Sequence, residues 1–458
     1  MSESVSSGTN IPLFPRAAIR RLILPLIVEQ FLAVTVGMAD TVMVASVGEA
    51  AVSGISIVDT LNILLINVFS ALATGGAVVA SQYLGREDEK MACRASNQLL
   101  LVGLVLSTVI GAVALLFNRQ ILTGIYGKIE PQVMDYARTY FYITALSFPF
   151  LAGYNSCAAI CRSMGNSQIS MKVSVLMNAI NIVGNAVLIF GFHMEVEGAA
   201  ISTLTSRLVA SLIMVKIVRN PRLQLHIDSR LRLGYDPRII AEILHIGIPV
   251  ALENSLFQGG KLLVAGLVTS FGTVSIAANA VAGTIASFQV IPGSAISLAM
   301  VTVVGQAVGA RRYEEARKYA LKLCGLAMLA HLAICLPMTV CLPQIIGFYG
   351  LSAETTQLAY TVSLIHGISC VVIWAPSFAL PNALRAANDV KFVMMVTLLS
   401  MAFCRILMSY VLGRYAGMGL VGVWTAMILD WVCRAVVFGN RFLSGRWLRK
   451  QMQLVSNG

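Results

Sequence analysis

The sequence predicts an all-α integral membrane protein whose twelve transmembrane helices form two pseudo-symmetric six-helix lobes. Composition, the number of apolar segments and an internal repeat all support this fold class. Of 458 residues, 57% are hydrophobic and only 12% are charged, whereas soluble globular domains carry about 25% charged residues. A crossing needs about 20 apolar residues, so this composition can supply a dozen spanning helices.

Polar loops containing Gly, Pro, Asn or charged residues separate the apolar segments. The segments are 22–47, 52–82, 97–117, 136–161, 173–192, 199–218, 243–268, 274–304, 320–345, 358–381, 392–413 and 420–440. The longest loop is rich in Arg and divides the chain in two. We expect a cytoplasmic N-terminal segment (1–21), an N-lobe of helices 1–6 (22–218), an inter-lobe loop (219–242), a C-lobe of helices 7–12 (243–440) and a cytoplasmic tail (441–458).

The basic residues indicate the orientation of these helices. The net charge is +12, and 25 of the 33 Lys and Arg fall on the side of the predicted N-terminus, Arg162 and Arg385 among them. Cytoplasmic loops accumulate basic residues, which predicts a multi-pass protein of the cytoplasmic (inner) membrane with both termini in the cytoplasm. The excess charge then needs no nucleic-acid partner.

An internal repeat relates the two halves. Sliding the chain by 224 residues aligns a set of matching residues without a gap, apart from a one-residue slip that pairs Arg162 with Arg385. The matches are Pro25 with Pro249, Glu29 with Glu253, Ser46 with Ser270, Gly48 with Gly272, Gln82 with Gln306, Gly85 with Gly309 and Gly198 with Gly422. Six helices per half make the repeats parallel, an arrangement found in transporters with a central site between the halves.

Five acidic residues fall inside predicted spans, where an ionisable group costs at least about 2.5 to 3.5 kcal/mol and needs a partner, a water-filled cavity or a function. Glu29 and Asp40 are eleven residues apart on helix 1, which places them on one face about 16 Å apart along the axis. Asp40 has no counter-charge nearby in sequence, which favours a cation or proton site over a buried structural carboxylate. For Glu29 the two interpretations are evenly balanced.

The other three buried acids differ in their neighbours. Glu253 is also evenly balanced. Lys261 on the same helix offers a structural ion pair, but their axial distance of about 12 Å favours other partners for Glu253, or water between the two. Asp430 has Arg434 at i+4, the spacing of an intrahelical pair, which favours a structural role. The role of Asp59 is undecided from sequence.

Helix 5 carries an amide stripe of Asn178, Asn181 and Asn185, and Thr203 follows on helix 6. Hydrogen bonding between helices is the commoner role of such residues in membranes. The alternative is that their oxygens, together with the Asp40 carboxylate, form a site for a hard cation such as Na+.

Several motifs resemble the multidrug and toxic compound extrusion (MATE) transporters over essentially the whole chain. They are GMADTVMVASVG at the end of helix 1, SQYLGREDEKMACR and its repeat GQAVGARRYEEARK, NAINIVGNAVLIFGF followed by EGAAIST, and GIPVALEN at the start of helix 7. The resemblance implies the MATE fold of two lobes facing a central cavity. It also implies export of amphipathic, often cationic molecules in exchange for Na+ or H+.

The resemblance also implies roles for individual residues. Asp40 matches the cation-coupling Asp of helix 1, and Asn181 and Thr203 match its partners, which gives a candidate Na+ site at Asp40, Asn181, Asn185 and Thr203. Asn185 replaces a second Asp that many members carry, which favours direct protonation of Asp40.

In the C-lobe, Glu253 matches a coupling Glu of the NorM branch. The helix 10 segment lacks the Asp that accompanies that Glu, and its only titratable residue is His366, a type that is more often packed than functional.

We therefore predict a secondary antiporter and not an enzyme, working by alternating access, with H+ or Na+ as coupling ion and no other cofactor. Glu29, Asp59 and Asn178 are candidate substrate-cavity residues, and Pro25 is a candidate helix bend, since proline removes a backbone hydrogen bond. The expected partners are a small amphipathic substrate and the lipid bilayer, and the expected state is a monomer.

Three alternatives remain at this point. One is a flippase for lipid-linked oligosaccharides, which commonly lines its cavity with basic residues, whereas the four intramembrane basic residues here look scattered in sequence. A second is a transporter for one specialised metabolite. An integral-membrane enzyme is the third, but the chain has neither D-D-x-x-D nor H-E-x-x-H.

Overall fold

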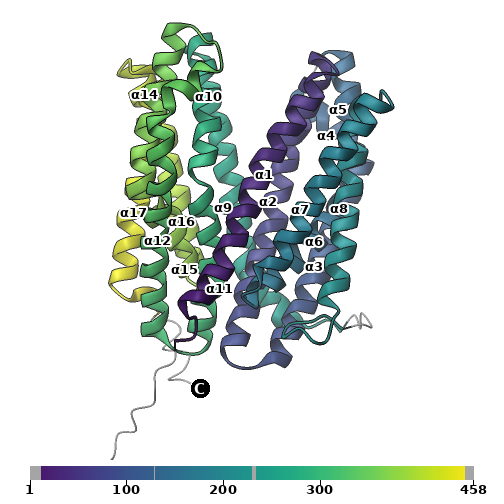
Figure 1. The fold of residues 1–458 in the computed structure, drawn as a ribbon, viewed down its shortest axis with the longest axis vertical. Helices are drawn as coiled ribbons and strands as arrows, with labels where there is room; N and C mark the ends of the chain where they lie inside the picture. Colours follow the sequence, from purple (N-terminus) through teal and green to yellow (C-terminus); the bar gives the residue numbers. More distant parts are fainter. Residues whose placement is uncertain (1–11, 128, 229–233, 449–458) are drawn as a thin grey trace, which may run out of the picture.

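The computed structural model describes residues 12–127, 129–228 and 234–448, and these form helices without any strand. The helices gather into two lobes that are joined at one end and diverge toward the other (Figure 1). Both ends of the described chain lie at the joined end. Helix α1 begins at the joined end and ends at the diverging end, and α9 does the same in the second lobe.

The N-lobe contains α1 (Arg16–Ala45), α2 (Glu49–Gly85), α3 (Glu89–Leu116), α4 (Asn118–Tyr126), α5 (Pro131–Leu146), α6 (Phe148–Ser163), α7 (Ser167–Asn185), the π-helical η1 (Ala186–Gly191) and α8 (Val196–Val218). The C-lobe contains α9 (Pro237–Thr269), α10 (Thr273–Gln289), α11 (Ile291–Gly309), α12 (Tyr313–Val340), α13 (Leu342–Gly347), α14 (Ala353–Ser369), η2 (Cys370–Ala379), α15 (Leu380–Ala386), α16 (Val390–Ser400), η3 (Met401–Leu407), η4 (Ser409–Tyr415) and α17 (Gly419–Leu443).

The described part of the chain has eleven helices that are long and apolar enough to cross a membrane, and the bent pair α5 and α6 makes up to twelve. That pair is bent by 46° next to Pro149, which lies in the first turn of α6. The predicted span 274–304 is also broken, at Val290 between α10 and α11, where Pro292 begins a new helix. Its repeat counterpart α2 runs unbroken because Val68 stands where the second lobe has proline.

The lobes meet where α2 and α11 pack closely at the joined end. A Cβ on Gly85 would overlap the backbone at Gln306, and a Cβ on Gly309 would overlap the backbone at Gln82. The two glutamines reach across the interface: Gln82 donates to the Ala386 carbonyl at 2.7 Å and Gln306 donates to the Ser163 carbonyl at 2.6 Å. These contacts repeat with the two-fold pattern of the sequence, so the same residue types close the joined end from both sides.

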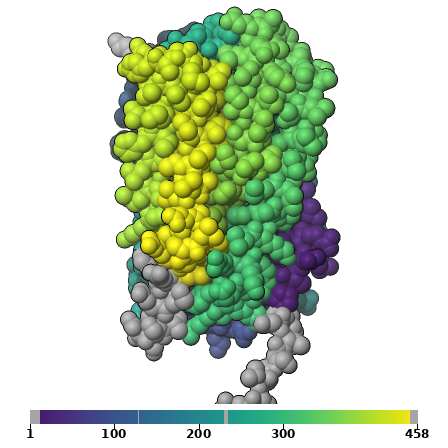
Figure 2. Space-filling model, turned by 90° about the vertical axis from the view of Figure 1, so that its left-hand side faces the viewer, coloured from purple at the N-terminus to yellow at the C-terminus, as the bar shows by residue number. Residues whose placement is uncertain are grey.

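On the outer face of the C-lobe, α17, in yellow, packs beside the green segments without a visible gap (Figure 2). Exposed apolar side chains on α17 include Leu429, Val436 and Leu443. An apolar outer surface of this kind suits contact with lipid. The polar side chains discussed below lie instead inside the lobes, around cavities or in buried ion pairs.

Candidate functional site

The N-lobe encloses a cavity of about 490 Å³ between α1, α2, α5, α7 and α8. Its polar lining consists of Asp40, Thr41, Ser56, Asp59, Tyr140, Asn178, Asn181, Asn185, Thr203, Ser206 and Arg207. Asp40 lies in the last two turns of α1, so the cavity is in the diverging half of the molecule (Figure 1). The structure therefore brings together the predicted residues from helix 1, helix 5 and helix 6.

Asp40 accepts hydrogen bonds from two amides of α7. Asn185 Nδ2 donates to Asp40 Oδ1 at 2.7 Å. When the Asn181 amide is oriented to satisfy its neighbours, its Nδ2 donates to Asp40 Oδ1 at 2.9 Å and Oδ2 at 3.2 Å, and its oxygen accepts from Thr203 Oγ1 at 3.3 Å. Amide donors therefore face the carboxylate, while the buried Asn185 Oδ1 has no hydrogen-bond partner within the described residues. Of the other predicted cavity residues, Asn178 donates to Ser174 Oγ on its own helix at 3.5 Å.

The second carboxylate of this cavity is Asp59 on α2, which interacts with Tyr140 and Arg207. Arg207 also donates to Ser147 Oγ at 2.7 Å. Tyr140 and Arg207 are not among the site residues predicted from the sequence. An intramembrane arginine is itself a signal for a partner or a cavity, and Arg207 lies one turn beyond the predicted Thr203.

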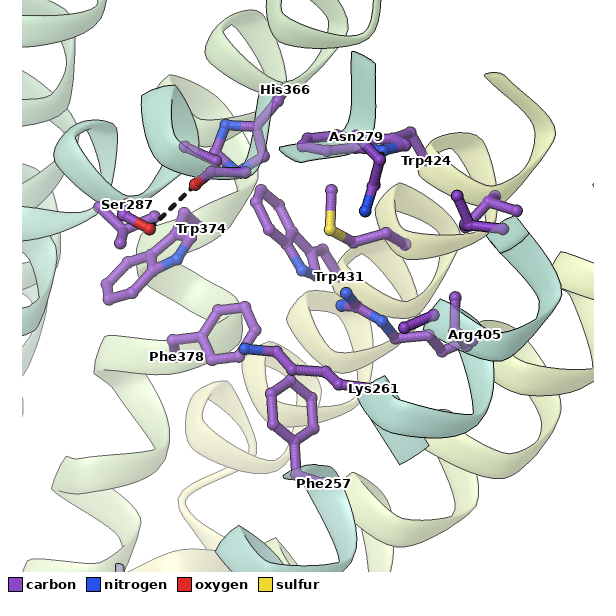
Figure 3. A pocket seen from close by; sticks show the side chains of 18 residues that line it. Phe257, Lys261, Asn279, Ser287, His366, Trp374, Phe378, Arg405, Trp424 and Trp431 are labelled. Atoms are coloured by element: carbon purple, nitrogen blue, oxygen red, sulfur yellow. Dashed lines mark hydrogen bonds between the residues drawn. The ribbon is translucent and has the colours of Figure 1, made fainter. Parts of the chain in front are cut away.

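The C-lobe encloses a second cavity, of about 460 Å³. Figure 3 shows its labelled lining: Phe257 and Lys261 from α9, Asn279 and Ser287 from α10, His366 from α14, Trp374 and Phe378 from η2, Arg405 from η3, and Trp424 and Trp431 from α17. Three cationic groups surround the Phe257 ring, with Lys261 Nζ at 5.2 Å, Arg405 Cζ at 5.6 Å and Arg434 Cζ at 5.0 Å from its centroid. The expectation that the intramembrane basic residues are scattered is thus wrong for three of the four, because helices distant in sequence pack side by side.

The two remaining candidate acids, Glu29 and Glu253, line neither cavity and lie instead in ion pairs. Arg162 at the end of α6 lies 3.6 Å from Glu29, which also accepts from Ser170 at 3.1 Å. Arg385 on α15 lies 2.7 Å from both oxygens of Glu253.

The pairs correct one expectation from the sequence, because Arg162 and Arg385 are helical and largely buried rather than part of cytoplasmic loops. The partner of Glu253 is Arg385, which agrees with the axial distance that disfavoured Lys261. The repeat offered the missing signal, since it aligned both the acids and the arginines.

Three other buried titratable groups of the C-lobe, Asp430, Arg434 and His366, have structural contacts. Arg434 Nε lies 2.9 Å from Asp430 Oδ1, which confirms the predicted intrahelical pair. His366 bonds to Gln289 and packs edge-on against Trp424 and Trp431. Pro25 lies inside α1, which continues through it, and its repeat partner Pro249 lies inside α9 in the same way.

A two-lobe bundle of spanning helices with polar cavities inside each lobe defines a multi-pass membrane transporter. The MatE family pattern matches residues 25–187 and 249–411, two segments that start 224 residues apart, as the repeat does. The chain belongs to the MatE family, whose members are transporters and not enzymes.

Similar proteins agree with this assignment. The chain is 28% identical to a protein named "Uncharacterized transporter YisQ" from Bacillus subtilis, over 93% of this chain and 94% of that protein. It is 24% identical to "Probable multidrug resistance protein NorM" from Thermotoga maritima, over 95% of this chain and 94% of that protein. A structure described as the outward-facing conformation of a multidrug resistance MATE family transporter superposes with a TM-score of 0.88 at 20% identity, covering 95% of this chain and 96% of that one, which shows a shared fold.

Proposed function

We propose that this transporter exports amphipathic drugs or metabolites, cationic ones among them, across the cytoplasmic membrane in exchange for H+ by alternating access. The observation that carries the coupling is the Asp40 carboxylate at the diverging end of α1, held by Asn181 and Asn185 in a cavity. The names of its relatives support the class of substrate. The basic residues at the joined end support placing that end, with both termini, in the cytoplasm.

The hydrogen bonds around Asp40 favour H+ over Na+ as the coupling ion. A Na+ ion needs oxygen ligands that converge on one point. Here the amide nitrogen of Asn185 faces the carboxylate, and that of Asn181 does so in the orientation that satisfies its neighbours, so both amides would have to turn before their oxygens joined Asp40 around an ion. A proton requires no such rearrangement, because it binds to Asp40 itself and removes the charge that the amides hold.

The closed joined end supports an outward-open state for this conformation. With that end in the cytoplasm, the N-lobe cavity faces the outside, where protons arrive. Neutralising Asp40 weakens its charge-assisted hydrogen bonds to α7 and so changes the packing of α1, whose Pro25 is a natural point for a bend. Alternating access is an equilibrium between two conformations, and a ligand shifts it only if it binds one conformation more tightly than the other. Here protonation of Asp40 supplies that difference in affinity.

Transport in proteoliposomes tests this proposal. We expect a pH gradient to drive ethidium transport by the native chain, and Asp40→Asn to reduce that transport to the level of protein-free vesicles. Thr205→Val is the matched control, since Thr205 is an exposed residue on the same helix as Thr203 and its loss should leave the rate unchanged. Full gradient-driven transport by Asp40→Asn would refute the role of Asp40, and transport driven only by a Na+ gradient would refute proton coupling.

A further inference from the structure

We propose that the C-lobe cavity is a binding site for an aromatic organic anion, such as an arene carboxylate. The proposal extends the proposed function, because it adds a second chemical class of cargo to the same transporter. Two unpaired cations and a wall of aromatic rings around one cavity are the observations that carry it.

The charge of this cavity is positive and uncompensated. Lys261 and Arg405 both line it and reach toward the same space from α9 and η3 (Figure 3). None of the described side chains that line it carries a carboxylate. The nearby Asp430 is already paired with Arg434. That pair is neutral, so Lys261 and Arg405 leave a formal charge of +2. An anion placed between Lys261 and Arg405 relieves their mutual repulsion.

Hydrogen-bond donors are also left free at this cavity. Within the described residues, Lys261 has no hydrogen bond or ion pair, and the enclosed Arg405 Nε has no hydrogen-bond partner. The indole N–H of Trp431 is likewise buried without a partner. Buried donors in folded proteins are almost always satisfied, so the two buried donors, Arg405 Nε and the Trp431 N–H, point to an acceptor-rich ligand beside Lys261. A carboxylate supplies two acceptor oxygens for groups of this type.

Aromatic rings form the rest of the wall. Trp374 and Phe378 stack with centroids 5.1 Å apart, and Trp431 meets Phe378 edge-on at 5.7 Å. Flat aromatic surfaces favour a flat aromatic ligand through offset or edge-to-face contacts. The volume of about 460 Å³ lies within the range of small-molecule pockets. A wall of this kind favours an aromatic carboxylate over the bare pyrophosphate of a lipid carrier.

The backbone is π-helical where several side chains of the cavity originate. Trp374 and Phe378 lie on the π-helical η2, and Arg405 lies on the π-helical η3. The repeat counterpart of η3 lies in α7, which is α-helical. Since π-helical turns are rare and often occur at functional sites, the C-lobe departs from the common scaffold where the cavity side chains originate.

Tryptophan fluorescence tests this site directly, because Trp374, Trp424 and Trp431 are three of the four tryptophans of the chain. The full-length protein in lipid nanodiscs is titrated with three quenchers of the same shape: 4-nitrobenzoate, neutral 4-nitrobenzamide and cationic 4-nitrobenzylammonium. We expect saturable quenching by 4-nitrobenzoate with an affinity at least about tenfold higher than for the other two, since a charged hydrogen bond contributes about that factor.

Variants assign the binding to the cavity. Lys261→Gln and Arg405→Gln should each weaken 4-nitrobenzoate about tenfold, Lys261→Arg should keep it, and Lys322→Gln, an exposed lysine on α12, should leave it unchanged. If Arg405→Gln does not fold, Lys261→Gln carries the test, because Lys261 is exposed to the cavity.

Three results would overturn the proposal. They are equal affinity for all three quenchers, tighter binding of the ammonium compound, or binding of inorganic pyrophosphate alone at Lys261 and Arg405. The binding assay needs no transport. Asp40→Asn should therefore still bind 4-nitrobenzoate, and the two proposals fail separately.

Discussion

The cavities of the two lobes occupy the same place in the repeated fold but have opposite polarity. Most of the residues that line the N-lobe cavity correspond, 224 positions later, to residues that line the C-lobe cavity. The polar exchanges include Gly37 to Lys261, Asp40 to Val264, Asp59 to Gly283, Asn181 to Arg405 and Arg207 to Trp431. Two carboxylates, three amides and one arginine thus line one cavity, and cations with aromatic rings line the other.

Other features have stayed the same in both lobes. The Glu29–Arg162 and Glu253–Arg385 pairs repeat, and so do the glycines and glutamines that close the joined end. The residues that hold helices together or let them approach are therefore shared, whereas the residues that face the cavities differ. The comparison teaches that one scaffold can hold a coupling site in one lobe and a site of different chemistry in the other.

The largest expected effect concerns the strengths of the two repeated ion pairs. Glu253→Ala leaves the guanidinium of Arg385 buried without its carboxylate, which typically costs about 3 to 5 kcal/mol of stability. Glu29→Ala breaks a longer contact of 3.6 Å and should cost less, because the attraction between two charges falls with their separation. Thermal unfolding of both variants in one detergent measures the difference, with Glu253→Gln as a control that retains a hydrogen-bond acceptor. Equal losses of stability would mean that the two lobes use this pair equally.

A smaller effect is expected from giving the C-lobe cavity the acid of the N-lobe. Val264→Asp restores the Asp40 counterpart one helical turn from Lys261, where opposite charges at i and i+3 pair. The pairing should lower the affinity for 4-nitrobenzoate by more than about tenfold, because the carboxylate competes for the same cation. Val264→Asn introduces a side chain of nearly the same shape as aspartate but without the charge. It should bind 4-nitrobenzoate much more tightly than Val264→Asp does. Similar affinities of the two variants would contradict the electrostatic difference between the lobes.

The smallest expected effect is on the amides that hold Asp40. Asn185→Ala removes the hydrogen bond of 2.7 Å to Asp40 Oδ1 and should reduce proton-driven ethidium transport about tenfold, the usual value of one hydrogen bond to a charged group. The initial rate in proteoliposomes at a fixed pH gradient measures it, and 4-nitrobenzoate binding in the C-lobe should not change. An unchanged rate would show that the α7 amides have no role in proton coupling.

The fold was largely predictable because a bilayer admits few solutions. Each crossing must satisfy its own backbone hydrogen bonds, which makes it a long apolar helix that hydropathy can find. The breaks at Ser147 and Val290 were missed, although Pro149 and Pro292 mark them, because both predicted spans remain apolar across the break.

The candidate site was predictable only in part. Asp40 and its α7 and α8 neighbours were found from residue type, helical periodicity and resemblance, whereas Tyr140 and Arg207 were not. The partner of Glu253 was left open by the sequence, since Lys261 is near it along the helix whereas Arg385 is near it only in space.

The sequence by itself determined the class of protein, the number of crossings and the two-fold repeat, since composition and periodicity are properties of the chain alone. It also placed a carboxylate at Asp40 in one half and none at Val264 in the other. Only the tertiary structure decided that Lys261, Arg405 and Arg434 gather around one aromatic ring. They come from three helices, and the packing of those helices sets the charge that a cavity presents to its ligand.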